Sequence, residues 1–402
     1  QYKITSADGG YNMSEFKDIP KSSTPKNEVL AYSIEIAKGK TQTYSVEFIY
    51  QNTTEDQSAD MGKELSGALY IEEGTVKSFD GGTLAEALMF YNPTIQTRSS
   101  FDSVFTETNT GTLYKATESI ANSPAKDVYY FAGNATNNWV KFANYYWRII
   151  RTNQDGSIRL LYAGTSPDTT EGYIGKSAFN STKEKPKYVG YMYGEDGSTL
   201  DGIRANTIDS TIKGIIDTWY SNNLSSYAKY LSKEAVYCND REIGSGTYNL
   251  GSDIFTFASR SRLENNKPSY NCTNIKDAFS VSNSEAKLTY PIGLMTADEI
   301  TYAGGYKDTR LISPYAWYYL NSTGGSITGT RGWWSLSPMR WNGSNAHSWI
   351  VDGSDRPGYL GYIYVGLPGG VRPAISLKTC TLWTSGNGAP ETPYEISTTS
   401  GC

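Results

Sequence analysis

The amino-acid sequence predicts an α+β, β-rich protein in which a small N-terminal antiparallel β-domain precedes a much larger domain. Short runs of alternating apolar and polar residues recur along the chain, and Gly81-Gly82 separates the first group of runs from the rest. Composition agrees, because 33 Tyr, 39 Gly and only 19% charged residues are typical of secreted β-rich proteins. A length of 402 residues accommodates two domains.

Charge and hydropathy exclude several classes of partner. A formal net charge of −5 and a pI near 5.2 argue against binding to nucleic acid or to an anionic membrane surface. No apolar run approaches the roughly 20 residues that a membrane-spanning helix needs. The chain starts at Gln1 rather than Met, as expected after removal of a leader, although a trimmed chain would look the same. We therefore expect an extracellular, cell-surface location.

The N-terminal region contains two predicted segments. Residues 1–28 are polar and aperiodic, which predicts an arm rather than a packed element. Residues 29–80 predict a small β-domain, because Leu30–Ile36 and Tyr44–Tyr50 alternate as a hairpin and Ser66–Glu72 follows as a third strand. Three strands leave open sheet edges unless another strand covers them.

The stretch from Gln51 to Gly67, with its flanking strands, resembles camelysin-type subunits of bacterial biofilm fibres. That resemblance implies a fibre or pilus subunit that self-associates when residues 1–28 donate a strand to a neighbour. The alternative is a small accessory domain that packs against the larger domain of its own chain.

The first half of the larger domain shows clear local signals. Leu84–Phe90 has helical spacing and good helix propensity. Val128–Phe131 and Trp139–Arg151 alternate as strands, and a turn at residues 153–156 returns the chain into a strand at Ile158–Tyr162.

Two further helices are predicted downstream. Asp209–Leu231 is helical with a break near Asn222-Asn223, and its expected buried face consists of Ile212, Ile215, Ile216 and Trp219. Thr296 and Glu299 match a capping box, which predicts the start of a short helix.

The four cysteines predict two disulfides, Cys238–Cys272 and Cys380–Cys402, because each pairing closes a local loop. Free buried thiols are the alternative. No pair has C-x-x-C spacing, so neither a zinc site nor a thioredoxin-type site is expected.

The segment between Pro338 and Gly369 has the composition of a recognition surface, with large aromatic residues among small polar ones. Trp333-Trp334 and Val371–Leu377 are expected to form its buried frame. The predicted ligand contacts are Arg340, Trp341, Asn342, Asn345, His347, Asp352, Tyr362 and Tyr364. The alternative is that the aromatic rings belong to the core and the polar residues form a loop.

Four segments in order resemble an uncharacterised surface-protein family common in gut Firmicutes: Tyr290–Glu299, Trp333–Pro338, Ser344–Trp349 and Gly370–Leu377. The resemblance covers residues 83–396, leaving 397–402 as a tail. It implies the C-type-lectin-like fold of formylglycine-generating enzymes and of the variable proteins of diversity-generating retroelements. Such a resemblance implies a fold rather than an activity.

Signals for catalysis are weak. His347 is the only histidine, and Ser335 and Ser337 lie outside any G-x-S-x-G motif. Asp298 and Glu299 are explained as first-turn residues of the capped helix. No catalytic residue, metal or cofactor is predicted, and scattered oxygen ligands alone do not predict calcium.

The sequence thus predicts a secreted or cell-surface binding protein, an adhesin with a protein or glycan ligand. The alternative is an extracellular hydrolase or modifying enzyme that acts on a surface polymer through acidic residues, with Asp298, Glu299, Asp352 and Asp355 as candidates.

Overall fold

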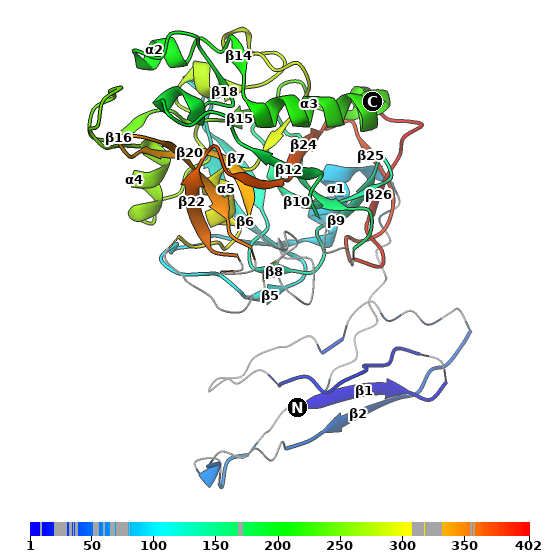
Figure 1. Ribbon diagram of the computed structural model, residues 1–402. Helices are drawn as coiled ribbons and strands as arrows, with labels where there is room; N and C mark the ends of the chain where they lie inside the picture. The colour runs from blue at the N-terminus through cyan, green and yellow to red at the C-terminus, as the bar shows by residue number, and fades with distance from the viewer. Residues whose placement is uncertain are drawn as a thin grey trace. The chain divides into compact units, whose positions relative to one another are not determined.

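The computed structural model describes residues 1–8, 10–19, 30–31, 34, 36, 39–50, 56–58, 61–64, 69, 79, 81–167, 172–307, 317, 332–353, 356 and 358–402. The chain forms two compact units, Gln1–Asp80 and Gly81–Cys402 (Figure 1). Both are consistent with a β-rich α+β protein. In the described residues, no helix has the length and apolar character required to cross a membrane.

In the first unit, β1 (Tyr2–Ser6) pairs antiparallel with β2 (Tyr44–Phe48) of the same chain. Tyr2 and Ile4 are buried together with Met13. The expectation of an unpacked, strand-donating arm is therefore wrong for these residues, because β1 already has a partner in its own chain. The alternation in β1 was too short to stand out in the sequence.

Other expectations for the first unit fall largely outside the described residues. These are the strand at Leu30–Ile36, the strand at Ser66–Glu72 and the camelysin-like stretch from Gln51 to Gly67. Self-association through this unit stays a prediction.

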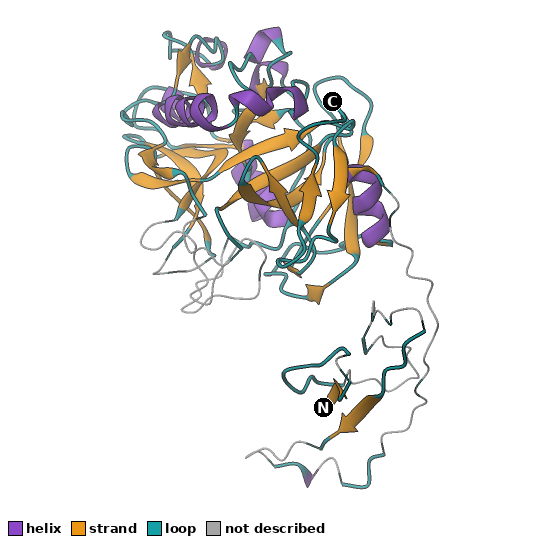
Figure 2. Cartoon of the chain, turned by 90° about the vertical axis from the view of Figure 1, so that its right-hand side faces the viewer, coloured by secondary structure: helices purple, strands orange, loops and turns teal. Residues whose placement is uncertain are grey.

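The second unit is built on two large sheets together with short helices, of which α5 (Ala297–Tyr302) is almost fully buried (Figure 2). The first sheet runs in the order β19 (Ile292–Leu294), β24 (Pro373–Leu377), β11 (Ile158–Gly164), β10 (Tyr145–Thr152), β9 (Trp139–Phe142), β26 (Tyr394–Ile396), β25 (Leu382–Ser385) and β3 (Gly82–Thr83). Three more strands extend it from β10: β7 (Lys126–Tyr130), β6 (Thr112–Glu118) and β4 (Thr94–Gln96).

The second sheet carries the predicted recognition segment. Its strands run in the order β12 (Gly175–Ala178), β23 (Pro368–Val371), β20 (Trp333–Trp341), β17 (Phe255–Phe257) and β16 (Ile243–Ser245), with β21 (Ala346–Val351) and β22 (Leu360–Tyr364) added at β20. Short two-stranded ladders pair β13 (Met192–Tyr193) with β14 (Ile208–Asp209), β15 (Tyr237–Cys238) with β18 (Ala278–Phe279), and β5 (Thr108–Asn109) with β8 (Asn134–Ala135).

The helices follow the local sequence signals closely. They are α1 (Leu84–Tyr91), α2 (Leu200–Ile203), α3 (Thr211–Asn223), α4 (Ala258–Glu264) and α5 (Ala297–Tyr302). The capping box at α5 is confirmed, since the Thr296 side chain accepts from the Glu299 N–H and the Glu299 carboxylate accepts from the Thr296 N–H.

The predicted break near Asn222-Asn223 is confirmed, because α3 ends at Asn223 and a 3-10 turn follows at Ser225–Tyr230. The expected buried face of α3 is partly wrong. Ile215 is 42% exposed, whereas Ile212, Ile216 and Tyr220 are buried. These three residues recur every four positions and form the stripe that packs inward.

The predicted hairpin is confirmed, because β10 pairs antiparallel with β11 across the turn at residues 153–156. Both disulfides are confirmed as well, with Cα–Cα distances of 5.7 Å for Cys238–Cys272 and 5.3 Å for Cys380–Cys402. The predicted frame is buried, including Trp333, Trp334 and the strand Pro373–Leu377.

Candidate recognition site

The recognition segment folds into three neighbouring antiparallel strands, β20, β21 and β22. Their register places His347 between Arg340 on one side and Tyr364 on the other, and sets Trp349 opposite Tyr362. Cross-strand neighbours point to the same face of a sheet. The strands therefore bring four of the predicted contacts, Arg340, His347, Tyr362 and Tyr364, to one place.

Two predicted contacts are buried instead of exposed. Trp341 is only 2% exposed, and its indole Nε1–H donates to the backbone oxygen of Gly251 at 2.8 Å. Trp341 lies opposite Phe255 of β17 and opposite Ala346 of β21, so its strand has a neighbour on both edges. His347 is 6% exposed. Alternation in the sequence does not reveal that a strand is covered on both faces, which explains both errors.

Asn342 and Asn345 build a turn and are partly exposed, and their contact with a ligand stays a prediction. The Asn342 side-chain oxygen accepts from the N–H groups of Ser344 at 3.1 Å and of Asn345 at 2.7 Å. Gly343, between them, has a φ of +90°, a conformation that favours glycine. This Asx-type turn connects β20 to β21 and fixes their register.

Asp352 lies at the opposite end of β21 from the Asn342 turn. Its carboxylate forms an ion pair with Arg356, with 2.7 Å between Oδ2 and Nη2. The Arg356 guanidinium lies 4.9 Å from the centre of the Tyr359 ring. Five positions along a strand correspond to roughly 16 Å, so Asp352 is far from His347. Asp355 falls outside the described residues.

The remaining residues form a continuous line of rings and cations, which we term the basic–aromatic row: Lys183, Tyr364, His347, Tyr362 and Arg340. The Lys183 ammonium lies 4.6 Å from the centre of the Tyr364 ring, and the Arg340 guanidinium 4.7 Å from that of Tyr362. The His347 ring centre is 6.0 Å from that of Tyr364 and 5.9 Å from that of Tyr362. Cation–π contacts of this kind hold both ends of the row.

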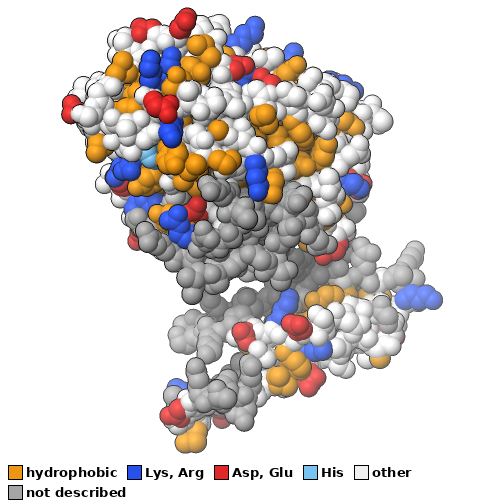
Figure 3. Space-filling view, viewed as in Figure 1, with side chains coloured by type: hydrophobic (Ala, Val, Ile, Leu, Met, Phe, Trp, Pro, Cys, Tyr) orange, Lys and Arg blue, Asp and Glu red, His pale blue; other side chains and the backbone are white. Residues whose placement is uncertain are grey.

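Tyr362 is the most accessible member of the row at 38% exposure, while Arg340, Tyr364 and Lys183 are partly exposed. On the face seen in Figure 3, hydrophobic and basic side chains lie next to one another over the β20–β22 region. Sequence reasoning missed Lys183, because it precedes the segment by more than a hundred residues and no local pattern distinguishes it.

The row is positively charged. Burial and the nearby Arg340 charge lower the pKa of His347 to about 4, against the opposing effect of its hydrogen bond to the Asn345 carbonyl. His347 is therefore neutral at pH 7, and Arg340 and Lys183 supply the charge. Within the part of the chain that the structure describes, neither cation forms an ion pair, and Arg340 Nε lacks a hydrogen-bond partner.

Asp298 and Glu299, two of the four acids considered for catalysis, form buried ion pairs instead. Glu299 Oε1 accepts from Arg151 at 2.8 Å and from Arg159 at 2.6 Å. Burial alone would raise the pKa of Glu299, but the charges of Arg159 and Arg151 lower it to about 2. Asp298 is likewise held by Arg262 at 2.8 Å.

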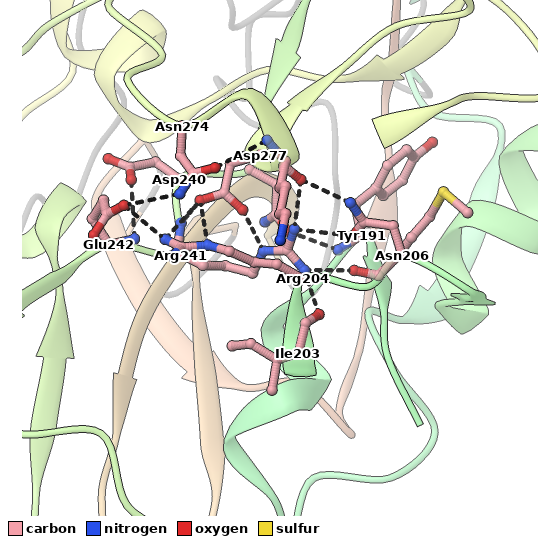
Figure 4. Close-up of polar contacts among 12 residues, drawn as sticks. Tyr191, Ile203, Arg204, Asn206, Asp240, Arg241, Glu242, Asn274 and Asp277 are labelled. Atoms are coloured by element: carbon pink, nitrogen blue, oxygen red, sulfur yellow. Dashed lines mark hydrogen bonds and ion pairs between the residues drawn. The ribbon is translucent and has the colours of Figure 1, made fainter. Parts of the chain in front are cut away.

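A second buried ionic cluster surrounds Asp277 (Figure 4). Its carboxylate binds the Arg241 Nε at 2.6 Å and the Arg204 Nη2 at 3.0 Å. Arg241 also donates to the backbone oxygens of Ile203 and Met192. These contacts satisfy the carboxylate from two sides and make it a structural group.

A surface groove of about 620 Å³ lies beside this cluster, a volume typical of small-molecule sites. Its lining residues are Ile120, Ala121, Asn122, Ser123, Glu242, Thr273, Asn274 and Ile275. Its one acid, Glu242, is bound through Oε1 by Arg204 at 3.1 Å and Asn274 at 3.2 Å.

Across the described residues, no group of three or more His, Cys, Asp or Glu side chains is placed to hold a metal ion. Comparisons with protein-family models, with curated proteins and with solved structures gave no match to this chain.

Proposed function

We propose that this chain is a secreted or cell-surface binding protein, an adhesin whose ligand contacts centre on the basic–aromatic row. The observation that carries the proposal is the continuous contact of three rings and two cations, of which Tyr362 is the most exposed member. Rings that are rigidly held and partly exposed gain contact area at low entropy cost.

The surrounding structure supports a recognition role. Trp333 and Trp334 are buried, and Trp334 donates to the backbone oxygen of Ser177 at 2.8 Å, so the strand that carries Arg340 is anchored to its neighbours. A rigid frame holds the exposed side chains in the geometry that binding requires.

An extracellular location and a C-type-lectin-like fold for the second unit are part of the same proposal. Two disulfides suit an oxidising compartment. The ordered motifs that resemble the gut-Firmicute surface family include parts of β20 and β21, the strands that carry Arg340 and His347, and also β24 of the other large sheet.

The alternative of a hydrolase is less well supported at two of its four candidate acids. Asp298 and Glu299 are each held by arginines in the interior, and Glu299 also caps α5. A general acid needs a raised pKa, whereas the pKa of Glu299 is lowered.

The proposal is tested by applying the full chain to an array of neutral and acidic glycans and to immobilised collagen and fibronectin. We expect at least one specific signal that falls about tenfold or more in Tyr362→Ala, because central aromatic anchors dominate binding energy.

The matched control is Tyr11→Ala, since Tyr11 has the same 38% exposure but lies in the first unit. Signals that both substitutions weaken equally, or that neither changes, would place binding elsewhere.

A further inference from the structure

Resting on the proposed function, we infer that the basic–aromatic row binds an acidic polysaccharide, with Arg340 and Lys183 contacting carboxylates of its sugars and Tyr362 and Tyr364 packing against the sugar rings.

The first argument is charge. The chain carries a net charge of −5, yet this row presents two cations. Among described side chains, neither Arg340 nor Lys183 forms an ion pair. Two other partly exposed arginines are paired, since Arg262 binds Asp240 and Asp298 and Arg260 binds Glu264. Arg98 instead donates to backbone oxygens of α5. Lys183 also interacts electrostatically with the exposed Glu184 beside it, so Arg340 is the stronger of the two cations for binding an anion.

The second argument is spacing. Tyr362 and Tyr364 are two residues apart on β22, so their side chains leave the same face about 7 Å apart. A cation covers each ring. The row therefore has a cation at each end and two tyrosine rings between the cations, so it can contact two carboxylates and the sugar rings that carry them.

The third argument separates a polysaccharide from an acidic peptide. Extended peptides gain affinity by main-chain hydrogen bonds to a strand edge. The row instead offers the exposed parts of side chains from β20, β22 and the segment after β12, which suits a ligand without a peptide backbone. The guanidinium of Arg340 presents a planar fork that matches a carboxylate.

The neutral His347 strengthens this assignment. Its ring touches both tyrosines and separates the two cations, so it holds the rings apart without adding a third charge.

The experiment measures binding of the full chain to polygalacturonate and to the same polymer with its carboxylates reduced to alcohols. We expect affinity to fall at least tenfold on reduction and to weaken as salt concentration rises. Arg340→Gln and Lys183→Gln should each lower affinity for polygalacturonate about tenfold, with unchanged melting temperatures.

Arg356→Gln is the matched control, because Arg356 also stacks on a tyrosine but is paired with Asp352. It should leave affinity unchanged. Equal affinity for the reduced polymer, or no effect of Arg340→Gln, would overturn the inference. So would polyglutamate binding as tightly as polygalacturonate, which would indicate a peptide ligand.

Failure of the acidic-polysaccharide inference and failure of the proposed binding function would give different results. If the reduced polymer binds as well and Tyr362→Ala abolishes that binding, the row is a recognition site and only its acidic specificity is wrong. If neither polymer binds and Tyr362→Ala changes no array signal, the proposed function fails as well.

Discussion

Arginine serves opposite purposes in two regions of this molecule. In the two buried ionic clusters, Arg151, Arg159 and Arg241 are each bound to carboxylates at 2.6 to 2.8 Å. In the basic–aromatic row, Arg340 lies against a ring and forms no ion pair among the described residues. The comparison teaches that an arginine's partners, rather than its presence, separate a structural charge from one available to a ligand.

The largest expected effect comes from breaking a buried pair. Glu299→Gln leaves Arg151 and Arg159 without their shared carboxylate charge, so we expect a loss of about 3 to 5 kcal/mol in the free energy of unfolding. Urea denaturation monitored by tryptophan fluorescence measures it.

The control is Asp127→Asn, which breaks the exposed pair with Lys115 and should cost less than about 1 kcal/mol. Equal losses of unfolding free energy in the two variants would show that the buried ion pairs of Glu299 stabilise the fold no more than an exposed pair does.

The second-largest expected effect is a loss of folding stability in acid, through the ion pairs of Glu299. The pKa of Glu299 lies at about 2, below its ordinary value of 4.5. Its carboxylate therefore stabilises the fold fully above about pH 4.5, and this contribution is lost as pH falls through about 2. The difference corresponds to roughly 3 kcal/mol.

Unfolding free energies of the wild type and Glu299→Gln, measured between pH 6 and 2, isolate this contribution. Their difference should shrink as pH falls. Parallel curves would mean that Glu299 does not titrate in that window.

In the row, stability and binding should separate. Tyr362→Ala is expected to change unfolding free energy by no more than about 0.5 kcal/mol, because its side chain is partly exposed. Trp341→Ala should cost about 3 to 5 kcal/mol, because it empties a buried site. Thermal unfolding of both variants checks this, and a comparable loss in Tyr362→Ala would make the ring structural.

The smallest expected effect is a shift in a single titration. His347 is the only histidine, so one imidazole signal in the proton NMR spectrum reports its pKa. We expect a midpoint near pH 4, and a higher midpoint in Arg340→Gln because a nearby positive charge is removed. A midpoint near 6.5 in the wild type would contradict the burial of this ring.

Local signals in the sequence predicted local structure well. The Thr296 cap, the turn between β10 and β11, and both disulfides depend on residues close together in the chain. Prediction failed where the outcome depends on distant partners. Whether Trp341 is exposed depends on Phe255 in β17, and the ionic network joins Arg151 to Glu299.

The candidate site was therefore predicted only in part. The aromatic content of β22 indicated a surface, and Tyr362 remains accessible. Asn342 forms a turn, and its contact with a ligand stays a prediction because asparagine serves both purposes. Nothing in the sequence pointed to Lys183.

The row is complete only when the second unit has folded, because Lys183 is far in sequence from the other members. Lys183 follows β12, while Tyr364 belongs to β22, and the Lys183 backbone oxygen accepts the Ala346 N–H at 2.8 Å. The two cations reach the opposite ends of the row only after the intervening chain has adopted its native topology. A nascent or partly unfolded chain would lack one end of the row, so ligand capture would coincide with maturation of the whole second unit.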